Sequence, residues 1–572
     1  MTNKEISEIL QEIALLLEIK GENPFKVRAY QNGARVVDGI GGDVGELVRA
    51  GKLREMKGIG EGLSEKITEI INTGSCQYHQ GLIRELPEGF LDLLKIQGLG
   101  SKRAKLLYDK LGIKSIGELE YACQENRLLA LEGFGEKSQA NILEAIKHYN
   151  KNKGYFLISQ IEEESGELLA YLKKRKEIIR IEVAGSFRRK KELVRDIDVL
   201  VSTKNPAPVH EAFVSYGEVE QVLAKGETKS SVILKSGVQA DLRTVTDQEF
   251  PYALYYFTGS KEHNVAVRTL AKRQNYKINE YGIFKNEKLV VCKNEEDIFK
   301  VLGLSYIPPE LRENTGEIGI ARGGKLPKLL EMKDIRGIFH VHSSYSDGRS
   351  TLEEMISAAE KMGYEFIGIA EHSKSAFYAN GLSADRILAQ RKEIDKLQKK
   401  YENIKIFQGI ESEISGDGAL DYPDRVLAQL DFVIGSVHSR MNLAEEEMTR
   451  RICRAMEHPA MTFLGHPTGR LLLAREGYAI NYEKLFEVAK KNNVAIEINA
   501  NPHRLDLDWR YMKLAKSMGL KMSINPDAHD VHGLQDVKYG VGIARKGWLE
   551  KSDVLNSMTA GEVEEWLGKR RL

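Results

Sequence analysis

Two aspartates separated by one residue follow a glycine-serine turn near the middle of the chain. Gly185 and Ser186 come after one apolar run, and Asp196 and Asp198 open the next. Side chains two residues apart on a strand point to the same face, so we expect both carboxylates on one side of a strand. Asp241 lies in a further strand-like segment and completes a set of three hard oxygen ligands suited to magnesium.

Three acids of this kind are suited to nucleotidyl transfer. Two magnesium ions about 3.5 to 4 Å apart clamp an attacking hydroxyl and a leaving pyrophosphate in line. An Asp-x-Asp pair at a strand end is also common as a turn or salt-bridge feature, so the pair alone leaves a structural role open. The basic run 188–191, directly after the turn, favours triphosphate binding, whereas we expect the basic run 173–176 to be a solvated face.

A second group of candidate residues lies in the C-terminal part, where nine of the thirteen histidines follow residue 335. Histidines and acids there come directly after apolar runs, with helical stretches between them. A repeated order of strand, ligand and helix predicts a β/α barrel with the ligands at the carboxyl ends of its strands. One histidine after a strand is usually a core or turn residue, but six in the same place favour a metal site. Mixed imidazole and carboxylate ligands suit zinc or manganese.

The N-terminal part repeats the pattern apolar-x-Gly-apolar-Gly three times, at 56–60, 96–100 and 131–135. Each copy precedes a helical pattern, so the glycines are expected to expose backbone N–H groups at a helix N-terminus, where phosphate is favoured. Such contacts position a duplex without reading its sequence. We expect the third copy to be degenerate and to pack helices only. The predicted DNA contacts are Gly58, Gly60, Gly98 and Gly100.

Size and composition bound the protein class. A chain of 572 residues is too long for a single hydrophobic core. Its net charge is only +1, so basic residues are concentrated locally and do not make the whole chain basic. No apolar run approaches the length of a membrane span, and the four cysteines form no Cys-x-x-Cys pair. We therefore expect a cytoplasmic, multidomain protein without a disulfide framework or a membrane segment.

With these motifs, residues 1 to about 313 resemble a family X DNA polymerase, the group that includes the short-gap repair polymerase. The resemblance identifies Asp196, Asp198 and Asp241 as the catalytic carboxylates. The turn at 256–260 matches the family's sugar-discriminating Tyr-Phe-Thr-Gly-Ser turn. The implied nucleotide contacts are Gly185, Ser186, Arg189, Tyr256, Phe257, Gly259 and Asn264, and Arg268 is an implied DNA contact.

The match has departures from the family pattern. Val194-Arg195 replaces a small Ser-Gly pair, Lys261 replaces an acid near the base, and Gln239 replaces an arginine beside the third carboxylate. These changes put nucleotide affinity and catalytic tuning in doubt, but not the reaction class.

The resemblance also raises the question of an abasic-site lyase in the N-terminal domain. Lys66 aligns with the family's Schiff-base nucleophile, and Lys26 and Tyr30 fall near its helpers. Gly62 stands where the family often has a lysine that holds the 5′ phosphate. A solvated Lys66 in a domain that only grips DNA is the alternative.

The C-terminal part resembles the polymerase and histidinol phosphatase (PHP) domain, a distorted β/α barrel that binds up to three metal ions. This resemblance implies metal-dependent phosphoester hydrolysis, with Glu411 as a bridging ligand. His503 lies outside the family pattern, and we expect it to be a substrate contact. The implied ligands are His340, His342, Asp347, His372, Glu411, His438, His466, Asp527 and His529.

We therefore expect a multidomain fold: an all-α helix-hairpin-helix region, an α+β nucleotidyltransferase palm with a thumb, and a distorted β/α barrel. The expected ranges are 1–85 (8 kDa-like DNA-binding domain), 86–150 (helix-hairpin-helix fingers), 151–250 (palm), 251–313 (thumb), 314–333 (flexible linker) and 334–572 (PHP domain).

The expected function is a monomeric DNA-directed DNA polymerase that fills short gaps in repair. Its partners would be gapped or nicked DNA, deoxynucleoside triphosphates and repair proteins, with magnesium in the palm and zinc or manganese in the barrel. The barrel would act as a 3′-5′ exonuclease, with abasic endonuclease or 3′-phosphatase activity left open. The alternatives are a barrel acting as a small-molecule phosphatase of the histidinol phosphate type, and a DNA-end scaffold with a structural metal domain.

Overall fold

The computed structural model describes residues 2–40, 43–87, 89–96, 98–150 and 154–569. It contains two compact units, Met1–Tyr149 and Asn150–Leu572. We call them the N-terminal and C-terminal units and describe each by itself. Gln97 of the second glycine repeat and the expected boundary residue 151 lie outside the described residues.

In the described residues of the N-terminal unit, every regular secondary-structure element is a helix. Its first helix begins at a capping box, in which Thr2 and Glu5 satisfy each other's backbone N–H groups, and it ends at Gly21 in the left-handed conformation. Two apolar clusters, one around Leu10 and Ile67 and one around Phe90 and Leu119, form its core. Its helices are α1 (Asn3–Lys20), α2 (Pro24–Asp38), α3 (Val44–Arg49), η1 (Leu53–Glu55), α4 (Glu61–Thr73), α5 (Gln77–Arg84), α6 (Phe90–Leu93), α7 (Ser101–Leu111), α8 (Ile116–Gln124), η2 (Arg127–Ala130) and α9 (Glu136–Asn150).

The three glycine repeats share one geometry. In each, the first glycine has a positive φ, which is 102° at Gly58 and 86° at Gly98 and Gly133. The second glycine directly precedes helix α4, α7 or α9. The apolar residue between the two glycines is buried in every copy, so it anchors the turn to the core. The third repeat, expected to be degenerate, therefore has the same backbone form as the first two.

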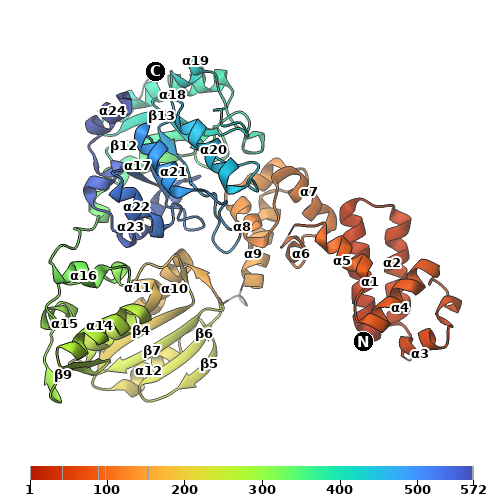
Figure 1. The fold of residues 1–572 in the computed structure, drawn as a ribbon, viewed down its shortest axis with the longest axis horizontal. Coiled ribbons are helices and arrows are strands. Elements are labelled where there is room, and N and C mark those ends of the chain that lie inside the picture. Colours follow the sequence, from red (N-terminus) through yellow and green to blue (C-terminus); the bar gives the residue numbers. More distant parts are fainter. Residues whose placement is uncertain (1, 41–42, 88, 97, 151–153, 570–572) are drawn as a thin grey trace. The chain divides into compact units, whose positions relative to one another are not determined.

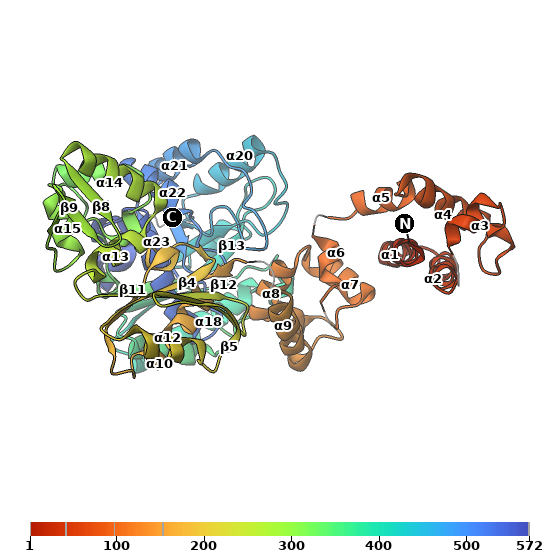
Figure 2. The same cartoon turned by 90° about the horizontal axis from the view of Figure 1, so that it is seen from below.

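The palm is a five-stranded sheet in the order β2-β4-β7-β6-β5, with β4 and β7 parallel and the other neighbours antiparallel. Helices α10 and α12 lie against one face (Figure 2), where Ile197, Val199 and Val201 are buried among their apolar residues. The elements are β1 (Phe156–Leu157), α10 (Ile158–Leu172), β2 (Ile178–Val183), α11 (Gly185–Arg188), β3 (Leu193–Val194), β4 (Asp196–Thr203), α12 (Pro206–Val214), β5 (Val219–Lys225), β6 (Lys229–Leu234) and β7 (Gln239–Val245).

The thumb region follows the palm and packs helices beside a small antiparallel sheet in the order β10-β9-β8. Its apolar cluster includes Tyr255, Val267, Phe299 and Trp548, so a tryptophan from the far end of the chain completes it. Its elements are α13 (Phe250–Thr258), α14 (Lys261–Arg273), β8 (Tyr276–Asn279), β9 (Gly282–Lys285), β10 (Lys288–Val290), α15 (Glu295–Val301) and η3 (Pro309–Leu311).

The segment 314–333 differs from the flexible tether that its glycines predict. It contains helix α16 (Glu317–Arg322) and the turn η4 (Met332–Asp334). Glu317 is fully buried and its carboxylate lies 2.7 Å from His263 Nδ1. Leu330 is also fully buried. The segment is held in place because its few apolar and acidic side chains have partners elsewhere in the chain, which local composition does not reveal.

The barrel contains seven parallel strands paired in chain order from β11 to β17 (Figure 1). A parallel bridge between Val341 and Ala528 brings the first and last strands together. The strands are β11 (Gly337–Val341), β12 (Phe366–His372), β13 (Lys405–Glu413), β14 (Phe432–Ser436), β15 (Phe463–Leu464), β16 (Ala495–Asn499) and β17 (Met522–Asn525).

Helices separate successive strands of the barrel, and five phenylalanines fill its interior at one end. The observed order of helical hairpins, α+β palm and β/α barrel confirms the fold class expected from the sequence. The helices are α17 (Leu352–Lys361), η5 (Phe377–Ala379), α18 (Ala384–Lys400), α19 (Asp424–Leu427), α20 (Glu445–Met456), α21 (Tyr482–Lys491), α22 (Trp509–Ser517), η6 (Gly533–Asp536), α23 (Val537–Lys546), η7 (Lys551–Asp553), η8 (Leu555–Ser557) and α24 (Ala560–Gly568).

Among the described residues, no helix combines the length and apolar character needed to cross a bilayer.

Candidate functional sites

The three palm carboxylates meet on neighbouring strands. Strand β4 carries Asp196 and Asp198, and its parallel partner β7 places Asp241 directly opposite Asp198. Ile197 and Val199 point into the core beneath α10 and α12, so the two aspartates face the other side of the sheet. Parallel pairing thus brings Asp241 beside two acids that lie more than 40 positions earlier in the sequence.

Crowding of these acids is visible in their pKa values. Burial, and then the charges of Asp196 and Asp241, raise the pKa of Asp198 to about 7. Burial and the nearby Asp241 also raise the pKa of Asp196. The pKa of Asp241 is lowered despite burial, because Lys229, Ser231 and Gln239 donate hydrogen bonds to its carboxylate. Bound cations would relieve this repulsion between like charges, so the carboxylate set fits divalent metal ions.

Lys229 is a residue that the sequence analysis missed. Its Nζ lies 2.7 Å from Asp241 Oδ2, and Gln239 Nε2 donates to Oδ1 at 3.1 Å. The position of Lys229 depends on the antiparallel register of β6 against β7, which pairs Lys229 with Arg243. No local motif marks it.

The glycine-serine turn packs directly on the carboxylates. Gly185 has φ +64°, and a Cβ at this position would lie 2.2 Å from Asp198 Oδ2. The Ala184 N–H donates to the Asp198 carbonyl at 2.8 Å, so the turn is tied to β4. Ser186 follows directly in the single turn of α11.

Arg189 occupies a more enclosed position than an open phosphate site predicts. Its Nε lies 3.0 Å from Glu313 Oε1, and its Nη1 donates to the Thr258 carbonyl at 2.5 Å. The neighbouring Arg188 pairs with Glu295. The basic run after the turn is therefore held by thumb carboxylates that lie over 100 positions away, and Arg189 joins the Gly-Ser turn to the turn at 256–260.

The remaining expected nucleotide contacts gather at that second turn. The rings of Tyr256 and Phe257 meet edge to face, with centroids 5.3 Å apart. Asn264 Nδ2 donates to the Tyr256 carbonyl at 2.7 Å, and Arg268 Nε donates to the Asn264 carbonyl at 3.3 Å. A Cβ on Gly259 would lie 3.1 Å from Arg189 Nη1, so this glycine gives the guanidinium room.

In the N-terminal unit, Lys66 lies beside an aromatic side chain that the sequence analysis did not single out. Its Nζ is 5.0 Å from the Tyr78 ring centroid, and Lys26 Nζ is 5.5 Å from the same ring. Tyr30 stacks on Tyr78 with centroids 6.3 Å apart. Two amines and two phenol rings thus share one site. Lys66 Nζ also donates a hydrogen bond to the Gly62 carbonyl at 3.5 Å. Gly62 itself stands where the family often has a second lysine.

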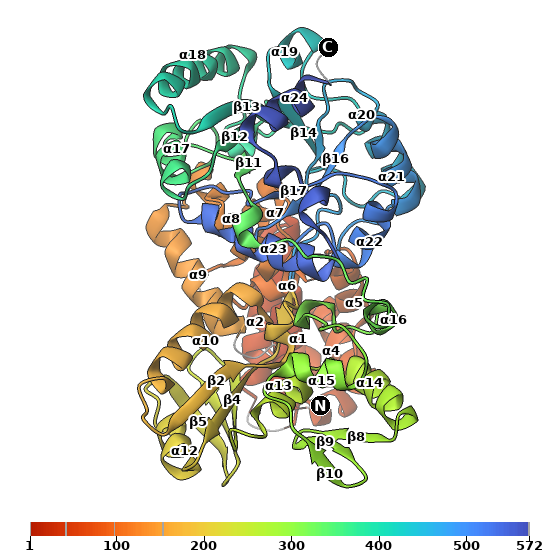
Figure 3. The same ribbon diagram turned by 90° about the vertical axis from the view of Figure 1, so that its left-hand side faces the viewer.

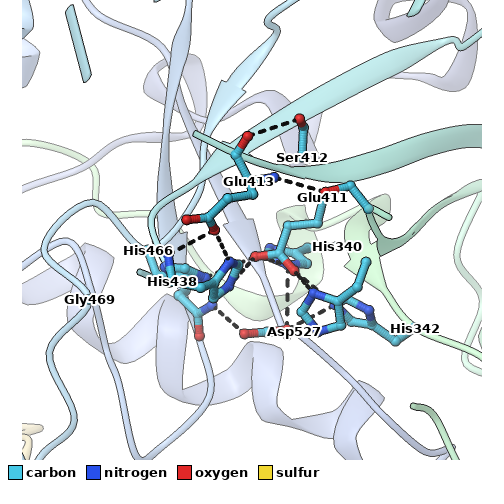
Figure 4. A network of polar contacts seen from close by, with 12 residues as sticks. His340, His342, Glu411, Ser412, Glu413, His438, His466, Gly469 and Asp527 are labelled. Atoms are coloured by element: carbon cyan, nitrogen blue, oxygen red, sulfur yellow. Dashed lines mark hydrogen bonds and ion pairs between the residues drawn. The ribbon is translucent and has the colours of Figure 1, made fainter. Parts of the chain in front are cut away.

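The barrel brings all nine expected ligands to the carboxyl ends of its strands, with Glu411 at the centre (Figure 4). Glu411 Oε1 lies 2.9 Å from His466 Nε2, 3.2 Å from His438 Nε2 and 3.4 Å from His340 Nε2. Its Oε2 lies 2.8 Å from His372 Nδ1 and 3.8 Å from His342 Nε2. One carboxylate in contact with five imidazoles is the arrangement of a bridging ligand.

Two further acids complete the centre. Asp347 lies 3.4 Å from both His372 Nε2 and His529 Nε2, and Asp527 Oδ1 lies 3.2 Å from His342 Nε2 and 3.4 Å from His340 Nε2. Three groups therefore have donor atoms close enough to hold an ion. They are His342, Asp347, His372 and His529; His340, His342 and Asp527; and His372, Glu411 and His438. Shared members indicate a multinuclear centre.

The polar atoms of this centre fit metal ions rather than mutual hydrogen bonding. Both ring nitrogens of His342 and His372, both carboxylate oxygens of Asp347, and Oε2 of Glu411 are buried without a hydrogen bond in the described structure. Buried polar atoms in this state are costly unless a cation coordinates them. His340 and Asp527 also adopt positive φ angles of 56° and 53°. Such backbone strain persists where the surroundings enforce it, as at binding sites.

Two acids that the sequence analysis missed orient the ligands. Glu497 on β16 is fully buried; its Oε1 lies 2.6 Å from His340 Nδ1, and its Oε2 accepts the His466 N–H at 2.6 Å. Glu413 Oε2 lies 3.0 Å from His438 Nδ1. A carboxylate on Nδ1 fixes the tautomer and leaves Nε2 free to coordinate. For Glu497, the sequence did offer a signal, because an acid stands within an apolar strand between Ile496 and Ile498.

His503 is buried in the structure, and its substrate contact stays a prediction. Its exposed fraction is 7%, and burial followed by the Arg504 charge lowers its pKa to about 4. Arg504 approaches the ligands instead, with Nε 3.6 Å from Asp527 Oδ2. Arg504 therefore contacts one of the expected ligands directly.

Comparison with known proteins matches this geometry region by region. Four family models match: a helix-hairpin-helix domain at 1–76, a SAM-like helix-hairpin-helix tandem at 90–148, the DNA polymerase beta thumb at 253–313 and the PHP domain at 339–501. Asp527 and His529 lie beyond the PHP match, although the barrel brings them to the other ligands.

Relatives match both the whole chain and its parts. The DNA polymerase/3′-5′ exonuclease PolX of Bacillus subtilis (strain 168) is 39% identical over 99% of both chains. The repair DNA polymerase X of African swine fever virus (isolate Tick/Malawi/Lil 20-1/1983) is 32% identical over 26% of this chain and 88% of its own. A probable phosphatase of Thermoanaerobacter sp. (strain X514) is 26% identical over 41% of this chain and 94% of its own. With a full-length relative at this identity, the chain belongs to the family X DNA polymerases that carry a C-terminal PHP domain.

Proposed function

We propose that this chain is a DNA-directed DNA polymerase that fills short gaps during DNA repair and a 3′-5′ exonuclease that trims 3′ ends. The observation that carries the proposal is the presence of two separate carboxylate-rich centres in one family X chain. One centre contains Asp196, Asp198 and Asp241, and the other is built around Glu411. Its substrates would be gapped or nicked DNA and deoxynucleoside triphosphates. We expect a cytoplasmic monomer that works with other repair proteins.

In the palm, Asp196 and Asp198 would hold two magnesium ions, which supply Lewis acidity and charge neutralisation for in-line displacement. Asp241 would orient the 3′ hydroxyl and draw off its proton. The backbone of Gly185 and Ser186 would hold the triphosphate, with Arg189 steadying it from the edge of the turn. Tyr256 and Phe257 would crowd the 2′ position of an incoming ribonucleotide.

In the barrel, the nine ligands would hold zinc or manganese, which activate water for attack on a phosphodiester. Glu411 would bridge the ions, and Glu497 and Glu413 would keep His340 and His438 in the coordinating tautomer. Arg504 would neutralise charge on the attacked phosphate. Abasic endonuclease and 3′-phosphatase activities would need the same groups.

The N-terminal unit would hold DNA through the exposed N–H groups that begin α4, α7 and α9. Lys66 would serve there as a phosphate contact or as a Schiff-base nucleophile. Trapping with borohydride on a 5′ deoxyribose phosphate separates the two roles, because only a Schiff base gives a covalent complex.

A single substrate tests both activities. Gapped DNA with a labelled 3′ end is incubated with wild type, with Asp196→Ala plus Asp198→Ala, and with His340→Ala plus His342→Ala, in magnesium or manganese. We expect the aspartate variant to lose extension and keep trimming, and the histidine variant to do the reverse. Trimming that persists at the wild-type rate in the histidine variant contradicts the nuclease assignment, and extension by the aspartate variant contradicts the polymerase assignment.

The similarity to a probable phosphatase favours one alternative for the barrel, a small-molecule phosphatase. The same histidine variant discriminates if wild type is assayed on a small phosphate monoester and on DNA. A DNA-directed nuclease is expected to prefer DNA strongly in kcat/KM, whereas preference for the monoester would support the alternative.

A further inference from the structure

A lysine of the barrel reaches the nucleotide-binding region of the palm. Lys546 ends helix α23, which lies on the side of the barrel toward the palm helix α10 and the thumb helix α13 (Figure 3). Its exposed fraction is 1%. Its Nζ donates to the Arg189 carbonyl at 3.0 Å and to Glu313 Oε1 at 2.5 Å.

The contacts of Lys546 continue into both nucleotide-binding turns. Glu313, the acceptor of Lys546, also accepts from Arg189 Nε at 3.0 Å, and Arg189 Nη1 donates to the Thr258 carbonyl at 2.5 Å. Thr258 belongs to the turn at 256–260. A continuous set of polar contacts therefore runs from the barrel through Glu313 and Arg189 to the turn that carries Tyr256 and Phe257.

The barrel also holds the next residues of the Gly-Ser turn. Trp509 Nε1 donates to Glu192 Oε2 at 3.2 Å, and Arg510 Nη1 lies 3.1 Å from Glu192 Oε1. The Lys190 side-chain stem lies 3.5 Å from the position of a Cβ on Gly542 in α23. Residues 189–192 are thus fixed from the barrel side by α22 and α23.

Lys546 differs from the other cations of α23 that cross to the palm and thumb. Lys538 pairs with Glu162 at 2.5 Å and Arg545 with Glu310 at 2.7 Å, and their side chains are 44% and 23% exposed. The Lys546 side chain is fully buried with three acceptors, the third being the Glu310 carbonyl at 3.5 Å. Burial lowers its pKa to about 8, although Glu313 opposes this. Burying an ammonium group costs more than burying an apolar side chain of similar volume, so simple adhesion between domains does not account for a lysine here.

We propose that Lys546 is a positioning residue for the polymerase reaction: it fixes the Arg189 backbone and shares the charge of Glu313, so that the Arg189 guanidinium stays poised between the two nucleotide-binding turns. Without Lys546, Arg189 and Lys191 face Glu313 alone, and the guanidinium is drawn toward that carboxylate. This inference rests on the proposed polymerase function. It makes the nuclease domain part of the nucleotide site.

The test measures steady-state incorporation of one deoxynucleotide on gapped DNA by full-length wild type, Lys546→Met and Lys538→Met. Lys538→Met is the matched control, because it removes a cross-domain ion pair of the same helix that does not touch the Gly-Ser turn. For Lys546→Met we expect KM for the deoxynucleotide to rise about tenfold, the effect of one buried charged hydrogen bond, with kcat changed less than about twofold. Trimming of a labelled 3′ end without deoxynucleotides should stay at the wild-type rate in both variants.

Two results would overturn the proposal: an unchanged KM in Lys546→Met, or an equal rise of KM in Lys538→Met. If Lys546→Met fails to fold, Lys546→Gln replaces it. The amide can still donate to the Arg189 carbonyl but carries no charge, so KM must still rise for the proposal to stand. Absence of templated extension by wild type would contradict the polymerase function itself. This result is distinct from failure of the Lys546 proposal, because it is measured on wild type and not on the variants.

Discussion

Gly185 occupies a position that no residue with a side chain can take unless Asp198 moves. The φ of +64° disfavours any residue with a Cβ, and the Cβ itself would lie 2.2 Å from the Asp198 carboxylate. The close approach places the turn directly against the Asp198 carboxylate. Glycine is therefore required here by both conformation and space.

We expect Gly185→Ala to lower the rate of nucleotide incorporation by about 100-fold, since a displacement near 1 Å at a reacting centre has effects of this order. Single-nucleotide extension under saturating substrate measures it. Gly217→Ala is the matched control in the same domain, because a Cβ on Gly217 meets no atom within 4 Å. The 3′ trimming rate should not change in either variant. Incorporation by Gly185→Ala within a few-fold of wild type would show that the carboxylates tolerate the displacement.

The candidate metal site in the barrel also depends on residues that support its expected ligands, and Glu497 is one of them. It contacts His340 and His466 at once and also accepts from Asn525 Nδ2 at 2.9 Å. A single buried carboxylate therefore contacts the His340 ring and the His466 backbone, which belong to separate parts of the barrel. The nine ligands alone do not define the geometry of the centre.

At the scale of elements, local pattern predicted which segments form strands and helices and which ligands follow the barrel strands. The local sequence pattern did not predict the pairing of β4 with β7 or the position of Lys229. Both depend on the register between strands that are distant in sequence. The basic run 188–191 illustrates the limit. Its composition favoured triphosphate binding but gave no sign that Glu295 and Glu313 from the thumb pair with its two arginines.

The segment 314–333 also shows why its glycine-rich composition gave the wrong expectation of a flexible linker. His263 on α14 and Glu317 on α16 form a fully buried pair, with Nδ1 2.7 Å from Oε1. Burial lowers the pKa of His263, and the hydrogen bond from His263 lowers the pKa of Glu317 against the effect of burial. A neutral imidazole therefore faces a charged carboxylate, and this pair fixes an element that its glycines predicted to be free.

This pair predicts a pH dependence of stability. Unfolded histidine binds a proton below about pH 6.5, whereas folded His263, whose pKa is lowered, binds one only at a lower pH. The contribution of the pair to stability is therefore fully present above about pH 6.5 and is lost as the pH falls. We expect the urea midpoint of unfolding to fall between pH 7.5 and 5.5, and to fall less in His263→Gln, which keeps an amide donor for Glu317. His458→Gln, at a side chain that is 25% exposed, should keep the wild-type slope. Equal slopes in wild type and His263→Gln would contradict the assignment.

At the scale of the whole molecule, one chain carries a centre that adds nucleotides and a centre that removes them. The C-terminal unit contains both, and Lys546 and Trp509 of the barrel contact residues beside the nucleotide turn. The two reactions are chemically opposed. Addition converts a deoxynucleoside triphosphate to a 3′-terminal nucleotide and pyrophosphate, and hydrolysis releases that nucleotide as a monophosphate.

Together the two centres should turn over deoxynucleotide without net synthesis. On a primer with one correct deoxynucleotide available, we expect wild type to release labelled monophosphate continuously from labelled triphosphate while the primer length stays constant. Neither Asp196→Ala plus Asp198→Ala nor His340→Ala plus His342→Ala should release monophosphate, because the first adds nothing and the second removes nothing. Mixing the two variants should restore release, because a DNA end can pass between molecules, and the rate of the mixture relative to wild type measures how far one chain hands the end between its own centres. Monophosphate release by either variant alone would mean that one centre performs both steps, and the division of labour between palm and barrel would then be wrong.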